Sequence, residues 1–92
     1  MAKTILITGA SSGLGAGMAR EFAGKGYNLA LCARRLERLE SLKQEIESKY
    51  AVRVEVRTLD VTDYDQVFVV FKAFQQDFGQ IDRIIVNAGI GN

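Results

Sequence analysis

The sequence predicts an α/β fold built on a parallel β-sheet, and three observations lead to this prediction. Short apolar runs of strand length alternate with stretches in which apolar residues recur at helical spacing. A glycine-rich segment, Thr8–Gly15, connects the first apolar run to the first helical stretch. The chain has 92 residues, of which 48% are hydrophobic and 25% charged, and this is the size and composition of one globular domain.

Two strands and two helices are predicted in the first half of the chain. Residues 3–8 form a continuous apolar run, typical of a strand buried on both faces, and residues 27–33 repeat that pattern. Helices are predicted over residues 13–25 and 35–50, and the first ends at glycines. The apolar positions expected on the covered faces are Leu14, Met18, Ala19, Phe22 and Ala23, and then Leu36, Leu39, Leu42 and Ile46.

Two further strands and one helix follow. Residues 52–56 alternate valine with charged residues, which predicts a strand with one solvated face at an edge of the sheet. A third helix is predicted over residues 63–78, with Thr62 as its N-cap and Asp65 completing a capping box. Residues 81–87 form an apolar fourth strand. The positions expected to face the sheet in the third helix are Val67, Val70, Phe71, Phe74 and Phe78.

The resulting order is β-α-β-α-β-α-β with short connections. Helical crossovers mean a parallel sheet, and right-handed crossovers place the first two helices on one face and the third on the other. The predicted strand order is 3-2-1-4, that of an incomplete Rossmann-type sheet, in which ligands bind at the carboxyl ends of the strands. Those ends are followed by the glycine-rich segment, by Arg34, by Asp60 and by Asn87, so we expect these groups to share one edge.

The glycine-rich segment, T-G-A-S-S-G-L-G, is a candidate phosphate-binding loop. Gly9 is expected to make the sharp turn from strand to helix, because it has no Cβ. Gly13 and Gly15 would let a phosphate-bearing ligand approach the backbone and let the helix pack against the sheet. The N-terminus of that helix offers free N–H groups and a partial positive charge to an anion. The alternative is a flexible loop in which Ser11 and Ser12 are only turn and cap residues.

Together these segments resemble the N-terminal half of the short-chain dehydrogenase/reductase family. The resemblance rests on the T-G-x-x-x-G-x-G loop, on Asp60-Val61 after the third strand and on Asn87-Ala88-Gly89 after the fourth, and it covers the whole chain. It implies one dinucleotide-binding domain over residues 1–92. The implied contacts are Gly9, Ser11, Ser12, Gly13, Leu14 and Gly15 at the pyrophosphate and ribose, Asp60 and Val61 at the adenine, and Asn87, Ala88 and Gly89 beside the fourth strand. For Asp60 and Asn87, a plain turn residue is the alternative.

The residues after the second strand favour NADP(H). An acidic residue at this place typically holds a free 2′-hydroxyl, but here Arg34 and Arg35 follow the strand and the first carboxylate is Glu37. Arginine holds a phosphate through charge-assisted hydrogen bonds, whereas a carboxylate repels it. Arg34 is the principal candidate, with Arg35 or Arg38 second. Ser12 departs from the basic residue that many NADP-preferring relatives carry in the loop. The alternative is that these arginines only solvate the helix start.

The family's chemistry needs a Tyr-x-x-x-Lys segment, which none of the three tyrosines of this chain provides. We therefore predict the cofactor-binding portion of an NADP(H)-dependent oxidoreductase, a fragment with no catalytic residue. A carbonyl or alcohol substrate would bind only to the intact protein. The alternative is a stand-alone half-domain that self-associates through its fourth strand, since that strand would leave an apolar edge unpaired.

Composition argues against several other classes of function. The net charge is +1 and the basic residues are dispersed, which does not favour nucleic acid. No apolar run approaches the ~20 residues of a membrane span, and no secretory signal is visible, so we expect a cytoplasmic protein. With no histidine and one cysteine, a metal site is not expected. Cys32 is predicted to be a small buried hydrophobe.

Overall fold

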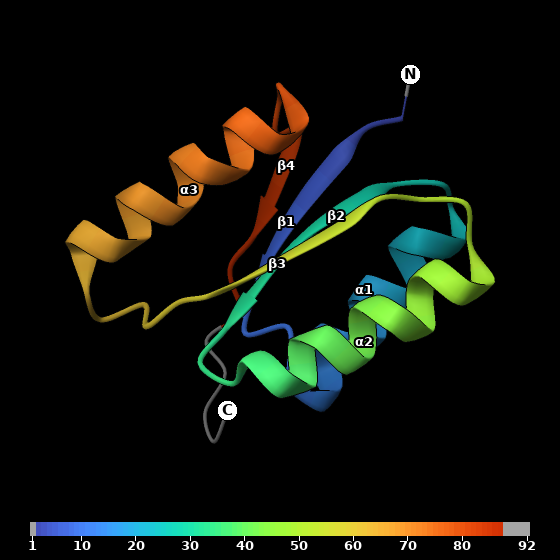
Figure 1. The fold of residues 1–92 in the computed structure, drawn as a ribbon, viewed down its shortest axis with the longest axis horizontal. Helices are drawn as coiled ribbons and strands as arrows, with labels where there is room; N and C mark the ends of the chain where they lie inside the picture. Colours follow the sequence, from blue (N-terminus) through green and yellow to red (C-terminus); the bar gives the residue numbers. More distant parts are fainter. Residues whose placement is uncertain (1, 88–92) are drawn as a thin grey trace.

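The computed structural model describes residues 2–87, in which four strands and three helices alternate along the chain. The elements are β1 (Thr4–Thr8), α1 (Gly13–Gly24), β2 (Asn28–Ala33), α2 (Leu36–Lys49), β3 (Val54–Thr58), α3 (Tyr64–Phe78) and β4 (Arg83–Ile85). The strands form one parallel sheet in the order β3-β2-β1-β4, which confirms the predicted fold class and strand order. Helices α1 and α2 lie together on one face of the sheet and α3 lies on the other (Figure 1).

The two faces of the sheet carry separate cores. Successive strand residues point to opposite faces, so Ile5 and Ile7 of β1 face α1 and α2, whereas Leu6 faces α3. Phe74 of α3 is fully buried against this second face, together with Cys32 of β2. The central strands are buried at nearly every position, as their continuous apolar runs predict.

Two apolar residues that were expected on covered helix faces are exposed instead. Leu14 is 69% exposed and Leu36 is 40% exposed, whereas Leu39, Leu42 and Ile46 are buried as predicted. Both exposed leucines lie in the first turn of their helix, beside the end of the sheet. Helical spacing alone therefore overstated the length of the covered face.

The start of α3 differs from the prediction. Asp63, not Thr62, is the N-cap, because its Oδ1 accepts a hydrogen bond from the Gln66 N–H at 3.2 Å. Thr62 instead donates its N–H and its hydroxyl to Asp60 Oδ1, at 3.0 and 2.7 Å. Asp65 lies in the first turn, where its charge favours the helix dipole, and forms no capping box with Thr62.

The two edge strands differ from each other. β3 is an edge strand as predicted, but two charged side chains along it do not simply face solvent. The guanidinium groups of Arg53, just before the strand, and Arg57, within it, lie 4.7 and 5.5 Å from the ring centroids of Phe78 and Phe74. The polar side of β3 thus packs on α3. β4 spans only three residues, fewer than the seven expected, and Ile84 is 49% exposed.

None of the helices in the described part of the chain has the length and apolar character needed to span a bilayer. This finding concerns those helices alone, and the cytoplasmic location stays a prediction.

Candidate functional site

The carboxyl edge of the sheet is organised around the turn from β1 into α1. Gly9 has a φ of +62°, a left-handed conformation that favours glycine. Gly15 packs directly on this turn, since a Cβ on it would lie 2.3 Å from the Gly9 carbonyl oxygen. A Cβ on Gly13, in contrast, would meet no atom of residues 2–87 within 4 Å. Two of the glycines therefore serve the turn and its packing, and the third leaves open space at the N-terminus of α1.

Ser12 and Asn87 join this turn to the end of β4. The Ser12 hydroxyl donates to the Gly9 carbonyl at 2.9 Å and accepts from the Gly15 N–H at 3.2 Å, which caps α1. The Asn87 side-chain amide donates to the Ser12 hydroxyl at 3.0 Å and to the Gly9 carbonyl at 3.3 Å. The Asn87 N–H donates to the Thr8 hydroxyl at 3.0 Å. Because a hydroxyl has a single proton, Ser12 has none left to give a ligand, and its role here is that of a cap.

Ser11 lies in a different setting. Its hydroxyl is buried and has no hydrogen-bond partner among the described residues. Ser11 lines a polar pocket of about 330 Å³ between the turn and α2. Burying an unpaired hydroxyl is unfavourable, so this group is available to a polar ligand that enters. The other lining residues are Ala10, Ala16, Arg20, Glu37, Arg38, Ser41, Leu42 and Glu45.

Arg34 and Asp60 follow neighbouring strands. The Leu59 N–H donates to the Ala33 carbonyl at 2.9 Å, which holds the ends of β2 and β3 together. Hydrogen bonds from the Thr62 side chain and then from its backbone hold the pKa of Asp60 below its usual value, and the charge of Arg34 adds a smaller contribution. Thr62 thereby stabilises the anionic form of Asp60.

Three of the remaining predicted contact residues are exposed to solvent. Arg35 is exposed and precedes α2 without capping it through its side chain. Leu14 and Val61 are apolar yet 69% and 51% exposed. Ala88 and Gly89 lie outside the described residues. Within residues 2–87, no three His, Cys, Asp or Glu side chains gather in a way that could hold a metal ion.

Known proteins resemble this chain over nearly its whole length. A family model described as short chain dehydrogenase matches residues 3–92. The chain belongs to this family. An uncharacterised oxidoreductase of Mycobacterium tuberculosis is 58% identical over 88 residues, which cover 95% of this chain and 35% of the relative.

Two solved structures show how closely the short-chain dehydrogenase fold is shared. An alcohol dehydrogenase from the archaeon Thermococcus sibiricus, complexed with 5-hydroxy-NADP, is 40% identical, with a TM-score of 0.94 over 99% of this chain and 39% of that chain. An NAD+-bound xylitol dehydrogenase is 32% identical, with a TM-score of 0.91 over 96% of this chain and 34% of that chain. The chain thus spans between 34% and 39% of the length of these relatives.

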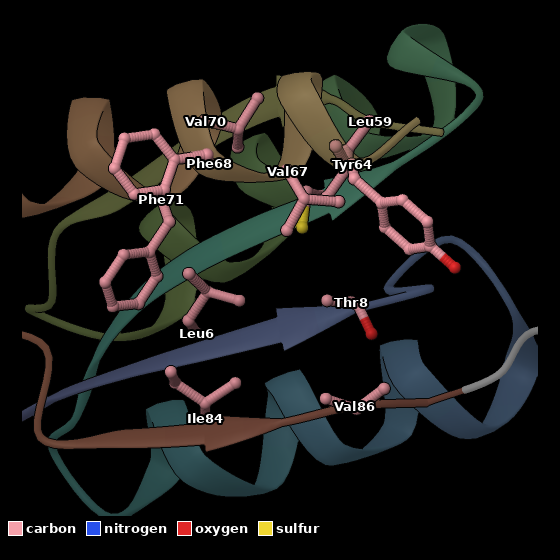
Figure 2. A pocket seen from close by; sticks show the side chains of 11 residues that line it. Leu6, Thr8, Leu59, Tyr64, Val67, Phe68, Val70, Phe71, Ile84 and Val86 are labelled. Carbon is pink, nitrogen blue, oxygen red and sulfur yellow. The ribbon is translucent and has the colours of Figure 1, made fainter. Parts of the chain in front are cut away.

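The sequence predicted an unpaired apolar edge at the fourth strand, but not the part that Tyr64 and Phe68 play in an apolar groove of about 360 Å³ beside it. Figure 2 shows Val67 and Phe71 of α3 across from Leu6 of β1, with Ile84 and Val86 along the open side. The signal was present in the sequence: Tyr64, Phe68 and Phe71 recur at helical spacing and give α3 a second apolar stripe. Cys32 also lines the groove. It is buried as predicted, and burial raises its pKa to about 12.

Proposed function

We propose that the chain is the cofactor-binding portion of an NADP(H)-dependent oxidoreductase that transfers hydride between nicotinamide and a carbonyl or alcohol substrate. Residues 1–92 would form one dinucleotide-binding domain that binds nucleotide without catalysis, since the sequence has no Tyr-x-x-x-Lys segment. The observation that carries the proposal is the carboxyl edge of the sheet, where the β1–α1 turn, Arg34, Asp60 and Asn87 each follow a strand of one parallel sheet.

The groups at this edge fit a dinucleotide. Open space at Gly13 lets a phosphate approach the N–H groups at the start of α1, and the unpaired Ser11 hydroxyl offers a donor beside them. A bound cofactor supplies the hydride chemistry, while the protein supplies binding and orientation. We assign the pyrophosphate and ribose to the segment that contains Gly9, Ser11, Ser12, Gly13, Leu14 and Gly15, in which the Ser12 hydroxyl also caps α1. We assign the adenine to Asp60 and Val61, and the contacts beside the fourth strand to Asn87, Ala88 and Gly89.

The preference for NADP(H) rests on positive charge near the end of β2. We place the 2′-phosphate at the polar pocket lined by Ser11, Arg38 and Ser41. Arg34, which follows β2 and lies outside the lining of this pocket, is its principal contact, with Arg38 or Arg35 as the second. The alcohol dehydrogenase relative was solved with 5-hydroxy-NADP and the xylitol dehydrogenase with NAD+, so the side chains, and not the fold, decide between the two cofactors.

Titration with NADPH and NADH side by side tests the proposal. We expect the chain to bind NADPH more tightly than NADH. Replacing Ala33 by Asp together with Arg34→Ala should weaken NADPH binding by roughly 2 kcal/mol or more, because a charge-assisted contact is lost and a repulsive carboxylate is added. Equal affinities for the two cofactors in the unmodified chain would refute the NADP(H) assignment. Absence of binding to both would refute the nucleotide-binding function.

A second candidate is favoured by the apolar groove and the open edge of β4. In this alternative, the chain is a stand-alone half-domain that self-associates through β4, with Ile84 and Val86 buried against a second copy. In the first proposal, further chain of a longer protein covers the same groove. Sedimentation of the 92-residue chain with and without NADPH distinguishes them: a stable dimer that binds neither cofactor would favour the second candidate.

A further inference from the structure

The polar pocket beside the β1–α1 turn contains an ion pair that connects two helices. Arg20 of α1 donates from Nε to Oε2 of Glu45 in α2 at 2.6 Å, and from Nη2 to Oε1 at 3.1 Å. The pair is therefore bidentate, the geometry in which arginine binds a carboxylate most specifically. This hydrogen bonding is the main cause that raises the pKa of Arg20 and lowers the pKa of Glu45, so the pair stabilises the charged form of each group.

The pair determines the charge that a ligand in this pocket meets. Four charged side chains line the pocket: Arg20, Glu37, Arg38 and Glu45. Arg20 and Glu45 neutralise each other, whereas neither Glu37 nor Arg38 forms an ion pair with another residue between 2 and 87. Without Arg20, the carboxylate of Glu45 would face the pocket uncompensated and give it a net negative charge.

We propose that Arg20 is a positioning residue that sets cofactor preference: by neutralising Glu45, it keeps the pocket receptive to the 2′-phosphate of NADP(H). Arg20 acts through Glu45, while Ser11, Arg34 and Arg38 remain the candidates for direct contact. The inference rests on the proposed function, in which this pocket receives that phosphate. Arg20 would then influence the choice between NADPH and NADH from α1, away from the arginines that follow β2.

The size of the effect follows from Coulomb's law. A pocket of about 330 Å³ is about 9 Å across, and a phosphate monoester carries about two negative charges at neutral pH. With the dielectric constant of water, one carboxylate at that distance changes the affinity for such a phosphate by about fivefold. NADH has no 2′-phosphate, so its affinity should not respond. Because the Debye length is about 30 Å at 0.01 M salt and 3 Å at 1 M, the effect should be visible at low salt and vanish at high salt.

Binding of NADPH and NADH at 0.01 M salt tests the proposal in three variants. Arg20→Ala should weaken NADPH binding about fivefold, and Glu45→Gln should tighten it by a similar factor, because Arg20 is then uncompensated. The double variant should return to the affinity of the unmodified chain. Lys25→Ala and Glu21→Gln are the matched controls: they change the net charge equally and break an ion pair of 3.7 Å on the same helix, outside the pocket. Neither control should alter the preference between the cofactors.

A purely structural role would give a different pattern. If the pair only held α1 against α2, both single variants would weaken the binding of NADPH and of NADH by the same factor. The double variant would then bind no more tightly than the single variants, and salt concentration would not change the effect. That result would overturn the proposal. Unchanged NADPH affinity in both single variants would overturn it too. In either case, a preference of the unmodified chain for NADPH over NADH would leave the proposed function standing. If the unmodified chain showed no such preference, the proposed function itself would be refuted.

Discussion

Gly15 gives the sharpest test of how α1 meets the turn that precedes it. A Cβ at this position would lie 2.3 Å from the Gly9 carbonyl oxygen and 2.9 Å from the Ala10 Cα, both of which are backbone atoms. Ordinary contact begins at 3.4 Å, so the helix and the turn would have to separate by about 1 Å. Overpacking of this kind costs about 1–3 kcal/mol, more than the gain of up to about 1 kcal/mol that alanine brings to a helix. We expect Gly15→Ala to lower the free energy of unfolding by about 2 kcal/mol.

The matched control is Gly17→Ala in the same helix. A Cβ on Gly17 would meet nothing within 4 Å, so the substitution should raise the free energy of unfolding by about 0.5–1 kcal/mol. Urea unfolding followed by far-ultraviolet circular dichroism measures both changes on the same protein. If Gly15→Ala proved as stable as Gly17→Ala, the close approach of helix and turn would be refuted as a requirement for glycine.

Three further outcomes are expected. Gly13→Ala should leave the free energy of unfolding unchanged or higher, because the added Cβ meets no atom of residues 2–87 within 4 Å. The same substitution should weaken NADPH binding in a titration, because the Cβ fills space needed by the phosphate. Unchanged NADPH affinity would count against that role of Gly13. Cys32, whose pKa is raised from 9.0 to about 12, contributes stability that is complete below pH 9 and is lost as the pH rises toward 12. Between pH 8 and pH 10 the unmodified chain should therefore lose about 1.4 kcal/mol more than Cys32→Ala in parallel denaturation curves, and equal losses would contradict the burial argument. Asp60 has a lowered pKa, so its contribution is present above its usual value of 3.8 and is lost as the pH falls through the native value. Thr62→Val should raise the pKa of Asp60 in a carboxyl NMR titration, and an unshifted titration would show that the Thr62 hydroxyl does not hold it.

The layers of the fold could be predicted because burial leaves a direct mark on the sequence. Continuous apolar runs at β1 and β2 identify strands covered on both sides, and right-handed crossovers with the first two helices on one face and the third on the other are consistent with the observed order β3-β2-β1-β4. The role of Gly9 could be predicted from backbone geometry: a strand that turns sharply into a helix needs a residue that tolerates positive φ.

The details that could not be predicted depend on competition between neighbouring groups. Thr62 and Asp63 are both good cap residues, and the choice fell to Asp63 because the hydroxyl of Thr62 is engaged by Asp60. Ser11 and Ser12 are adjacent and identical in type, yet in the described part of the chain the Ser12 hydroxyl has a full set of hydrogen-bond partners and the Ser11 hydroxyl has none. Alternation at β3 predicted a polar face, but not that arginine guanidinium groups would lie over the rings of α3.

The hydrogen bonds between Asn87 and the β1–α1 turn also constrain the order of folding. Asn87 lies 75 positions after Ser12 and 79 after Thr8, so these bonds close nearly the longest loop that the chain can form. Contacts of such sequence separation carry a high closure entropy and tend to form late. A nascent chain emerging from the ribosome can assemble β1, β2 and β3 with their helices well before β4 arrives. We therefore expect nucleotide affinity to develop only when the last strand has docked, which makes cofactor binding a reporter of completed folding.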